Sequence, residues 1–182
     1  MIQYLLDTAH STIEFSVPQL VISRVRGRFT NFAGLIDLDP DDITRSKVNV
    51  EIDAASLTTG LARRDAHLRS KEILDVATYP LISFESTHVE EDGEVLRVTG
   101  LLTMHGVTGE VSLRVEPLGS LTDPFGTGRI AFAATVEIDR LDFGLRFSHV
   151  FDTGGLLAGL IGERVSIELE VQAVSAAARA AA

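Results

Sequence analysis

The sequence predicts an all-β fold, an antiparallel barrel of eight strands with one or two short helices inserted around residues 58–75. Three observations lead to this prediction. Apolar and polar residues alternate along most of the chain, turn residues separate the alternating runs, and one segment breaks the alternation. With 182 residues, of which 45% are hydrophobic, the chain has the size and composition of one globular domain with its own core.

The alternation is clearest over residues 46–53, where Val48, Val50 and Ile52 share one face and charged or polar residues share the other. Such a pattern is typical of a half-buried strand. Together with seven similar runs it gives the predicted strands 12–17, 25–39, 46–53, 81–90, 95–103, 110–118, 130–138 and 165–172. Eight strands suffice for a closed barrel that just holds one small ligand.

The connections predict neighbouring antiparallel strands and one helical insertion. Asp92-Gly93 is a two-residue hairpin signal, and residues 106–109 and 123–126 supply the next two turns. Over 58–75 the apolar residues change to helical spacing, and Pro80 ends the segment. We therefore expect a single domain, 1–174, with a helical lid across the barrel. The alanine-rich tail 175–182 is expected to be frayed.

Charge and composition exclude several classes of function. The 16 basic and 26 acidic residues give a net charge of −10, which disfavours nucleic acid as a partner. With no cysteine, the chain has no disulfide, thiolate metal site or thiol nucleophile. P-loop, G-x-S-x-G and H-E-x-x-H motifs are absent, and the G-x-G-x-x-A match at 126–131 opens a strand instead of a helix. We expect no cofactor.

The five histidines, at positions 10, 67, 88, 105 and 149, are scattered without metal-ligand spacing, so we expect no metal site. No basic residue precedes the first apolar run, which Asp7 ends, and no run approaches the roughly 20 apolar residues of a membrane helix. We expect neither a signal peptide nor a membrane span, and a cytoplasmic location.

Two questions stay open at this level. Residues 63–71 carry four fixed positive charges and one negative charge, which suits either an anionic head group at a barrel mouth or a solvated helix face. The inward strand positions are mostly branched aliphatic residues with scattered phenylalanine, which suits a ligand cavity and a filled core equally. The charges around Leu141, at Asp139, Arg140 and Asp142, suit a structural corner better than an acid pair with an electrophilic arginine.

Several segments resemble the YceI-like family, in the family's order and over nearly the whole chain. They are residues 6–11 (LDTAHS) with Ile13 and Phe15, 25–29 (VRGRF) with Phe32 and Gly34, 64–70 (RDAHLRS), Tyr79-Pro80 with Ile82 and Phe84, 100–108 (GLLTMHGVT), and 139–144 (DRLDFG). The resemblance implies a lipocalin-like barrel that encloses a polyisoprenoid or similar amphiphile, often as a homodimer. Many family members are exported, unlike the location expected here. The apolar loop 154–162 is expected to line the mouth.

The leading hypothesis is therefore a non-enzymatic protein that binds, stores or transports a long isoprenoid, with a polyprenyl phosphate, pyrophosphate or quinone-type end. The residues expected to line its tunnel are Phe15, Val17, Val25, Phe29, Val50, Ile52, Ile82, Phe84, Leu102, Leu113, Phe132 and Phe143. Arg64, His67 and Arg69 are the head-group candidates. One alternative is an enzyme with His105 or His67 as general base and Arg140 as electrophile. Another is a filled barrel that serves as an interaction or stress-response module.

Overall fold

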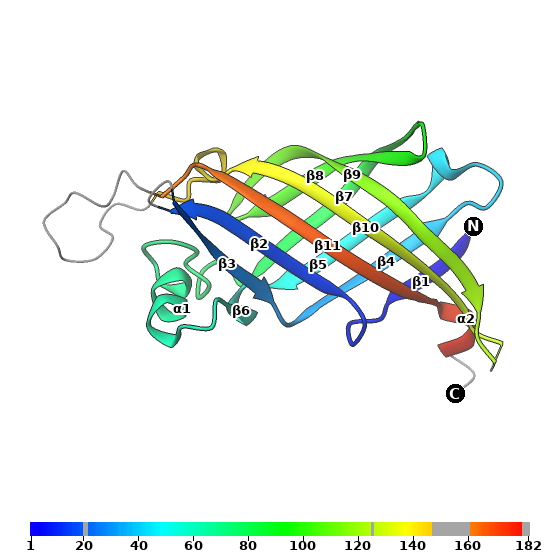
Figure 1. The fold of residues 1–182 in the computed structure, drawn as a ribbon, viewed down its shortest axis with the longest axis horizontal. Coiled ribbons are helices and arrows are strands. Elements are labelled where there is room, and N and C mark those ends of the chain that lie inside the picture. Colours follow the sequence, from blue (N-terminus) through cyan, green and yellow to red (C-terminus); the bar gives the residue numbers. More distant parts are fainter. Residues whose placement is uncertain (20–21, 125, 147–160, 180–182) are drawn as a thin grey trace, which may run out of the picture.

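The computed structural model describes residues 1–19, 22–124, 126–146 and 161–179, which form an elongated β-barrel (Figure 1). Within these ranges eleven strands make one antiparallel sheet. The strands are β1 Ile2–Leu6, β2 Thr12–Gln19, β3 Ser23–Phe29, β4 Phe32–Leu38, β5 Lys47–Asp53, β6 Leu57–Thr58, β7 Leu81–Asp92, β8 Val95–Met104, β9 Val107–Thr122, β10 Gly128–Asp139 and β11 Arg164–Ser175. The helices are α1 Ala62–Arg69 and α2 Ala176–Arg179, with 3₁₀ turns η1 Ile43–Arg45, η2 Ala54–Ser56 and η3 Arg140–Phe143.

The eleven strands occupy eight barrel positions, because three positions each hold two consecutive strands. β1 and β2 both pair with β11, through its residues 173–175 and 166–170, so they are the halves of one bent strand. At the next position, β3 pairs with β2 and β4 pairs with β1. At the position after that, β6 pairs with β3 and β5 pairs with β4. The pairing of β1 with β11 closes the sheet, which confirms the predicted closed antiparallel barrel of eight strands.

The sequence prediction missed two details of the strands. The predicted strand 25–39 is divided at Thr30-Asn31 into β3 and β4, which pair with different neighbours. Residues 2–6, which were not among the eight predicted strands, form β1. Both differences arise because a bent strand changes its neighbours along its length, and alternation does not record that change.

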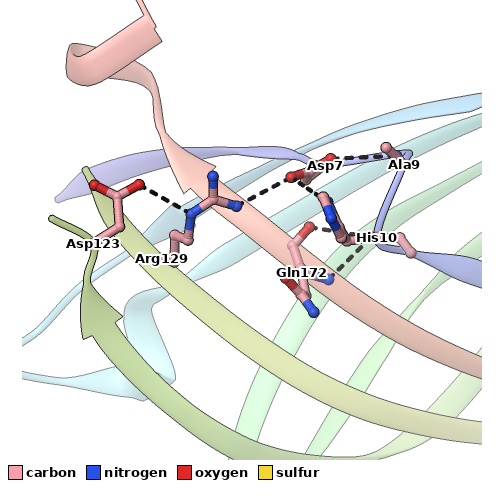
Figure 2. Close-up of polar contacts among 7 residues, drawn as sticks. Asp7, Ala9, His10, Asp123, Arg129 and Gln172 are labelled. Atoms are coloured by element: carbon pink, nitrogen blue, oxygen red, sulfur yellow. Dashed lines mark hydrogen bonds and ion pairs between the residues drawn. The ribbon is translucent and has the colours of Figure 1, made fainter. Parts of the chain in front are cut away.

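The bend between β1 and β2 is held by polar contacts that reach β10 (Figure 2). Asp7 accepts hydrogen bonds from the backbone N–H of Ala9 at 3.2 Å and from Arg129 at 3.1 Å, and its Oδ2 lies 2.9 Å from Nδ1 of His10. Arg129 also donates to Asp123 at 3.3 Å. Partial burial alone would raise the pKa of the Asp7 carboxyl, but the bonds from His10 and Arg129 outweigh it and hold that pKa below its ordinary value.

Ser11 contributes further hydrogen bonds to this corner, where it contacts Gln172. Its hydroxyl donates to the carbonyl oxygen of Gln172 at 3.1 Å and accepts from the N–H of Gln172 at 3.0 Å. Gln172 lies on β11 between the residues that pair with β1 and those that pair with β2. The side chain of Ser11 therefore replaces the ladder bonds that the bend interrupts.

Two-residue turns join β7 to β8 and β8 to β9. The first begins at Gly93, whose φ of +69° favours glycine, so the predicted hairpin is present one residue further along the chain. In the second, His105 and Gly106 have φ of +52° and +73°, as a type I′ turn requires. The turn predicted at 106–109 is therefore centred on 105–106, and 107–109 belong to β9.

The segment predicted to be helical contains α1, which lies at the end of the barrel opposite the chain termini (Figure 1). The helix begins after Leu61 and ends before Ser70, whose N–H donates to the carbonyl oxygen of His67. The residues that follow form turns up to Tyr79, and they carry Ile73 and Leu74 into the core. The tail that we expected to be frayed includes the single turn of α2 in its described part.

The buried apolar residues form two clusters. One lies at the α1 end and contains Ala54, Leu57, Ile73, Leu74, Ile82, Leu102, Met104, Ile138, Phe143 and Leu145. The other lies around β1 and contains Tyr4, Leu6, Ile13, Phe32, Ile36, Ile130 and Ala173. Phe29, Ile52 and Ile167 pack against both clusters and are themselves only partly buried. The two ends of the barrel are thus better packed than its middle.

Candidate functional site

The middle of the barrel is a cavity of about 300 Å³ with apolar walls. β5 shows how the sequence builds these walls. Its inward residues Val48, Val50 and Ile52 are half-buried, while the alternating Lys47, Asn49 and Glu51 are exposed to solvent. Inward side chains in a filled barrel would be buried, whereas these retain accessible surface because they face the cavity. This finding contradicts the filled-barrel alternative.

Most of the predicted tunnel residues border the cavity. Those that do are Phe15, Val17, Val25, Phe29, Val50, Ile52, Ile82, Phe84, Leu102, Leu113 and Phe132. Their contact with a ligand stays a prediction.

The assignment of Phe143 to the tunnel was wrong. The strand β10 ends at Asp139, whose carboxylate accepts a hydrogen bond from the N–H of Leu141 at 2.9 Å and so starts the turn η3. Period-two alternation no longer applies beyond that point. Phe143 is buried in the cluster at the α1 end, and its ring contacts Gly109 instead of bordering the cavity.

Two of the three head-group candidates border the cavity. Arg64 donates from Nε to the hydroxyl of Thr59 at 2.7 Å and from a terminal nitrogen to the carbonyl oxygen of Thr59 at 3.0 Å. Nε2 of His67 lies 3.0 Å from a carboxylate oxygen of Glu72. The third assignment was wrong, since Arg69 does not border the cavity and donates to the carbonyl oxygen of Leu57.

Asp65 fixes α1 to the barrel. Its buried carboxylate accepts from the N–H of Thr59 at 2.8 Å and from the hydroxyls of Thr59 at 2.5 Å and Thr58 at 3.0 Å. Burial would raise the pKa of this carboxyl, but these hydrogen bonds and the nearby Arg69 lower it further than burial raises it. An ionised Asp65 therefore holds α1, with Arg64 and His67, at its place beside β6.

Sequence reasoning missed several residues of the cavity. Val111, Val136, Ile167, Leu169 and Val171 belong to the same alternating runs and could have been found from them. Leu68, Ile73 and Leu74 close the α1 end; they belong to the segment predicted to be helical, but its spacing did not place them against the cavity. The polar residues Glu14, Gln19 and Ser46 also border the cavity without a sequence signal, as does Arg140, which the sequence singled out only for the charge cluster and the enzymatic alternative.

The residues of the enzymatic alternative are not brought together as it requires. His105 lies in the β8–β9 turn, with its ring 5.1 Å from that of Tyr79, and does not border the cavity. Arg140 is buried and donates to the carbonyl oxygens of Leu145 at 2.6 Å, Gly162 at 3.0 Å and Ile161 at 3.4 Å. Burial lowers the pKa of Arg140. These bonds identify Arg140 as a structural tie, so the enzymatic alternative rests on His67.

The loop 154–162, expected at the mouth, lies outside the described residues except for 161 and 162. In the described part of the chain, no group of three or more histidine and carboxylate side chains is placed to hold a metal ion. No helix among these residues is long and apolar enough to cross a membrane.

The closed eight-stranded barrel with an apolar interior defines the class as a lipocalin-like β-barrel with a ligand-sized cavity. The YceI-like domain matches residues 4–173, and the chain belongs to that family. A UPF0312 protein of Vibrio parahaemolyticus is 40% identical over 145 residues, which cover 78% of this chain and 77% of the relative.

Solved structures show the same fold. The Campylobacter jejuni YceI protein superposes with a TM-score of 0.73 at 30% identity, covering 84% of this chain and 86% of that protein. A polyisoprenoid binding domain from Saccharophagus degradans, implicated in plant cell wall breakdown, superposes with a TM-score of 0.68 at 22% identity, covering 96% and 99%. The barrel fold is thus shared by proteins of quite different sequence.

Proposed function

We propose that the protein binds a long isoprenoid lipid in the barrel cavity and serves as its carrier or store. The observation that carries this proposal is the apolar cavity, whose aliphatic and aromatic walls include half-buried side chains such as Val48, Val50 and Ile52 of β5. Burial of each CH₂ group contributes about 0.8 kcal/mol, so a branched hydrocarbon tail gains affinity along its whole length without strong polar contacts. The polyisoprenoid binding domain of S. degradans, which has this fold, supports the same class of ligand.

The polar residues bordering the cavity support an orientation for the lipid. Arg64 and His67, on α1, stand at one end, and the opposite end, around Leu6, Ile36 and Leu38, is apolar apart from the uncharged Ser46. Arginine suits phosphate, and a neutral imidazole also suits a quinone carbonyl. We place the polar end of the lipid near α1 and its tail toward β1.

The test is to identify lipid that copurifies with the protein. Protein purified without detergent is extracted with organic solvent, the extract is analysed by mass spectrometry, and the intact complex is weighed by native mass spectrometry. A stoichiometric isoprenoid is the expected result. Protein that is empty and takes up no added isoprenol or quinone would overturn the proposal.

Paired variants test whether the cavity is the site. Phe84→Arg places a charge among apolar walls and should abolish lipid retention. Leu101→Arg is the control, because Leu101 lies opposite Glu85 on the outer face of the neighbouring strand and is 42% exposed. Both variants should give the circular dichroism spectrum of a folded barrel. If Phe84→Arg keeps the lipid, the ligand lies elsewhere.

A further inference from the structure

We propose that the α1 end of the barrel docks onto an anionic lipid bilayer. This inference goes beyond the proposed function, because it concerns a surface and a partner instead of the cavity. The docking surface consists of Ile22, Leu61, Arg24 and Arg26. It combines exposed apolar side chains with exposed arginines at one end of the molecule.

The apolar part of the docking surface stands in solvent without cover from the described residues. Ile22, beside the start of β3, is 90% exposed, and Leu61, at the start of α1, is 55% exposed. β3 starts, and α1 lies, at the end of the barrel opposite the termini (Figure 1), while β6 pairs with Arg28 and Phe29 at the other end of β3. Two separated apolar side chains are ordinary by themselves, so the inference depends on their combination with the exposed arginines at the same end.

The basic part of the docking surface lies on the outer face of β3. Arg24 donates to the hydroxyls of Ser16 at 3.3 Å and Ser166 at 3.1 Å, and Arg26 lies opposite Ser16 in the ladder. Neither arginine has a carboxylate partner among the described residues. The acids along this face are Glu14, opposite Arg28, Glu168, opposite Glu14, and Glu137, which lies opposite Ser166 and is paired with Arg164 at 3.0 Å. Arg24 and Arg26 therefore keep their positive charge exposed near Ile22 without an ion-pair partner among the described residues.

The opposite end of the barrel shows why both features are needed. Leu118 and Leu121 on β9 are 56% and 61% exposed, so that end also presents apolar side chains. The arginine opposite Leu121, however, is Arg129, which is already bonded to Asp7 and Asp123. In a chain of net charge −10, the α1 end thus combines exposed apolar side chains with two exposed arginines that have no described carboxylate partner, whereas the arginine beside Leu121 is already paired.

A bilayer fits this surface better than a second protein. Anionic headgroups complement Arg24 and Arg26, and shallow insertion of Ile22 and Leu61 needs no matching surface. A stable protein interface buries roughly 800 Å² on each partner, which two separated side chains do not supply. If the proposed function holds, docking also brings the end of the cavity with Arg64 and His67 against the membrane, so that a lipid could transfer without crossing water.

The test is co-sedimentation with vesicles of phosphatidylcholine alone or of phosphatidylcholine and phosphatidylglycerol in equal parts. The protein should bind the mixed vesicles, more strongly at low salt, and should not bind phosphatidylcholine alone. Each basic residue at an anionic surface contributes about 1 kcal/mol, or about five-fold in affinity, so Arg24→Gln/Arg26→Gln should weaken binding about 25-fold. The control Arg97→Gln/Arg114→Gln removes the same charge from β8 and β9 and should have little effect.

A second pair of variants tests the apolar contacts. Ile22→Ser/Leu61→Ser should weaken vesicle binding, and Leu118→Ser/Leu121→Ser should not. All four positions are more than half exposed, so the variants should fold. The proposal is overturned if the wild type does not bind mixed vesicles, or if both arginine pairs weaken binding equally. It is also overturned if sedimentation velocity shows that the wild type is a dimer, Arg24→Gln/Arg26→Gln dissociates this dimer, and the wild type does not bind vesicles. If the protein carries isoprenoid but does not bind vesicles, only the docking proposal fails and the proposed function stands.

Discussion

One methyl group added at Gly27 should destabilise the barrel and push the ring of Phe15 toward the cavity. A Cβ atom at this position would overlap Cζ of Phe15, lie 2.8 Å from its Cε1, and lie 2.9 Å from the carbonyl oxygen of Thr58. Overpacking of this kind costs about 3 kcal/mol when a backbone atom is one of the obstacles. Restriction of the unfolded chain by alanine returns about 1 kcal/mol. The net loss in the free energy of unfolding is therefore about 2 kcal/mol.

Urea denaturation of a double-mutant cycle measures this effect. Phe15→Leu removes the ring atoms that the new methyl group meets. The free energy of unfolding of Gly27→Ala/Phe15→Leu should therefore be about 1 kcal/mol higher than the value expected if the two single changes were additive. The clash with Thr58 remains and limits the recovery. Gly128→Ala is the control, because a Cβ there would meet no atom closer than 3.7 Å. Strict additivity, or a Gly27→Ala variant as stable as Gly128→Ala, would refute the reasoning.

Three further outcomes follow from the same contacts. The pKa of Asp7 lies below its ordinary value of 3.8, so its carboxylate stabilises the fold above that pH, and this contribution is lost as pH falls through the folded pKa. Asp7→Asn should therefore make acid unfolding less steep below about pH 4, and an unchanged slope would contradict this. Asp65→Asn should lower the free energy of unfolding by about 2 kcal/mol and speed amide hydrogen exchange first in α1. If amide exchange accelerates equally over the whole barrel, Asp65 does not anchor α1. Arg64→Gln should release a phosphate-headed isoprenoid more readily than a quinone, and equal retention of both would remove the proposed phosphate contact.

The family motifs have different physical roles in the structure. Asp7, His10 and Ser11 hold the bend between β1 and β2, and Gly27 leaves room for Phe15. Asp65 anchors α1. These residues build the barrel around the cavity instead of acting inside it, so a motif that identifies the fold need not mark the residues that touch a ligand.

The sequence by itself determined the fold class, most of the strands and part of the cavity wall. Period-two alternation depends only on local geometry, so once Val50 and Ile52 are assigned to one face of β5, that whole face is known. The turn at Gly93 and the helix in 58–75 are also local, because glycine conformation and helical spacing act within a few residues.

Only the tertiary structure decided whether the interior is filled or hollow. The closure of β1 on β11 and the bends that divide three barrel positions set which side chains meet across the barrel. They also set the distance between opposite barrel walls. The structure also placed Phe143 and Arg69 outside the cavity. Phe143 lies in η3, beyond the end of β10, and Arg69 donates to the carbonyl oxygen of Leu57, twelve residues away in sequence. Contacts between residues far apart in sequence set these features, and a local pattern contains no information about them.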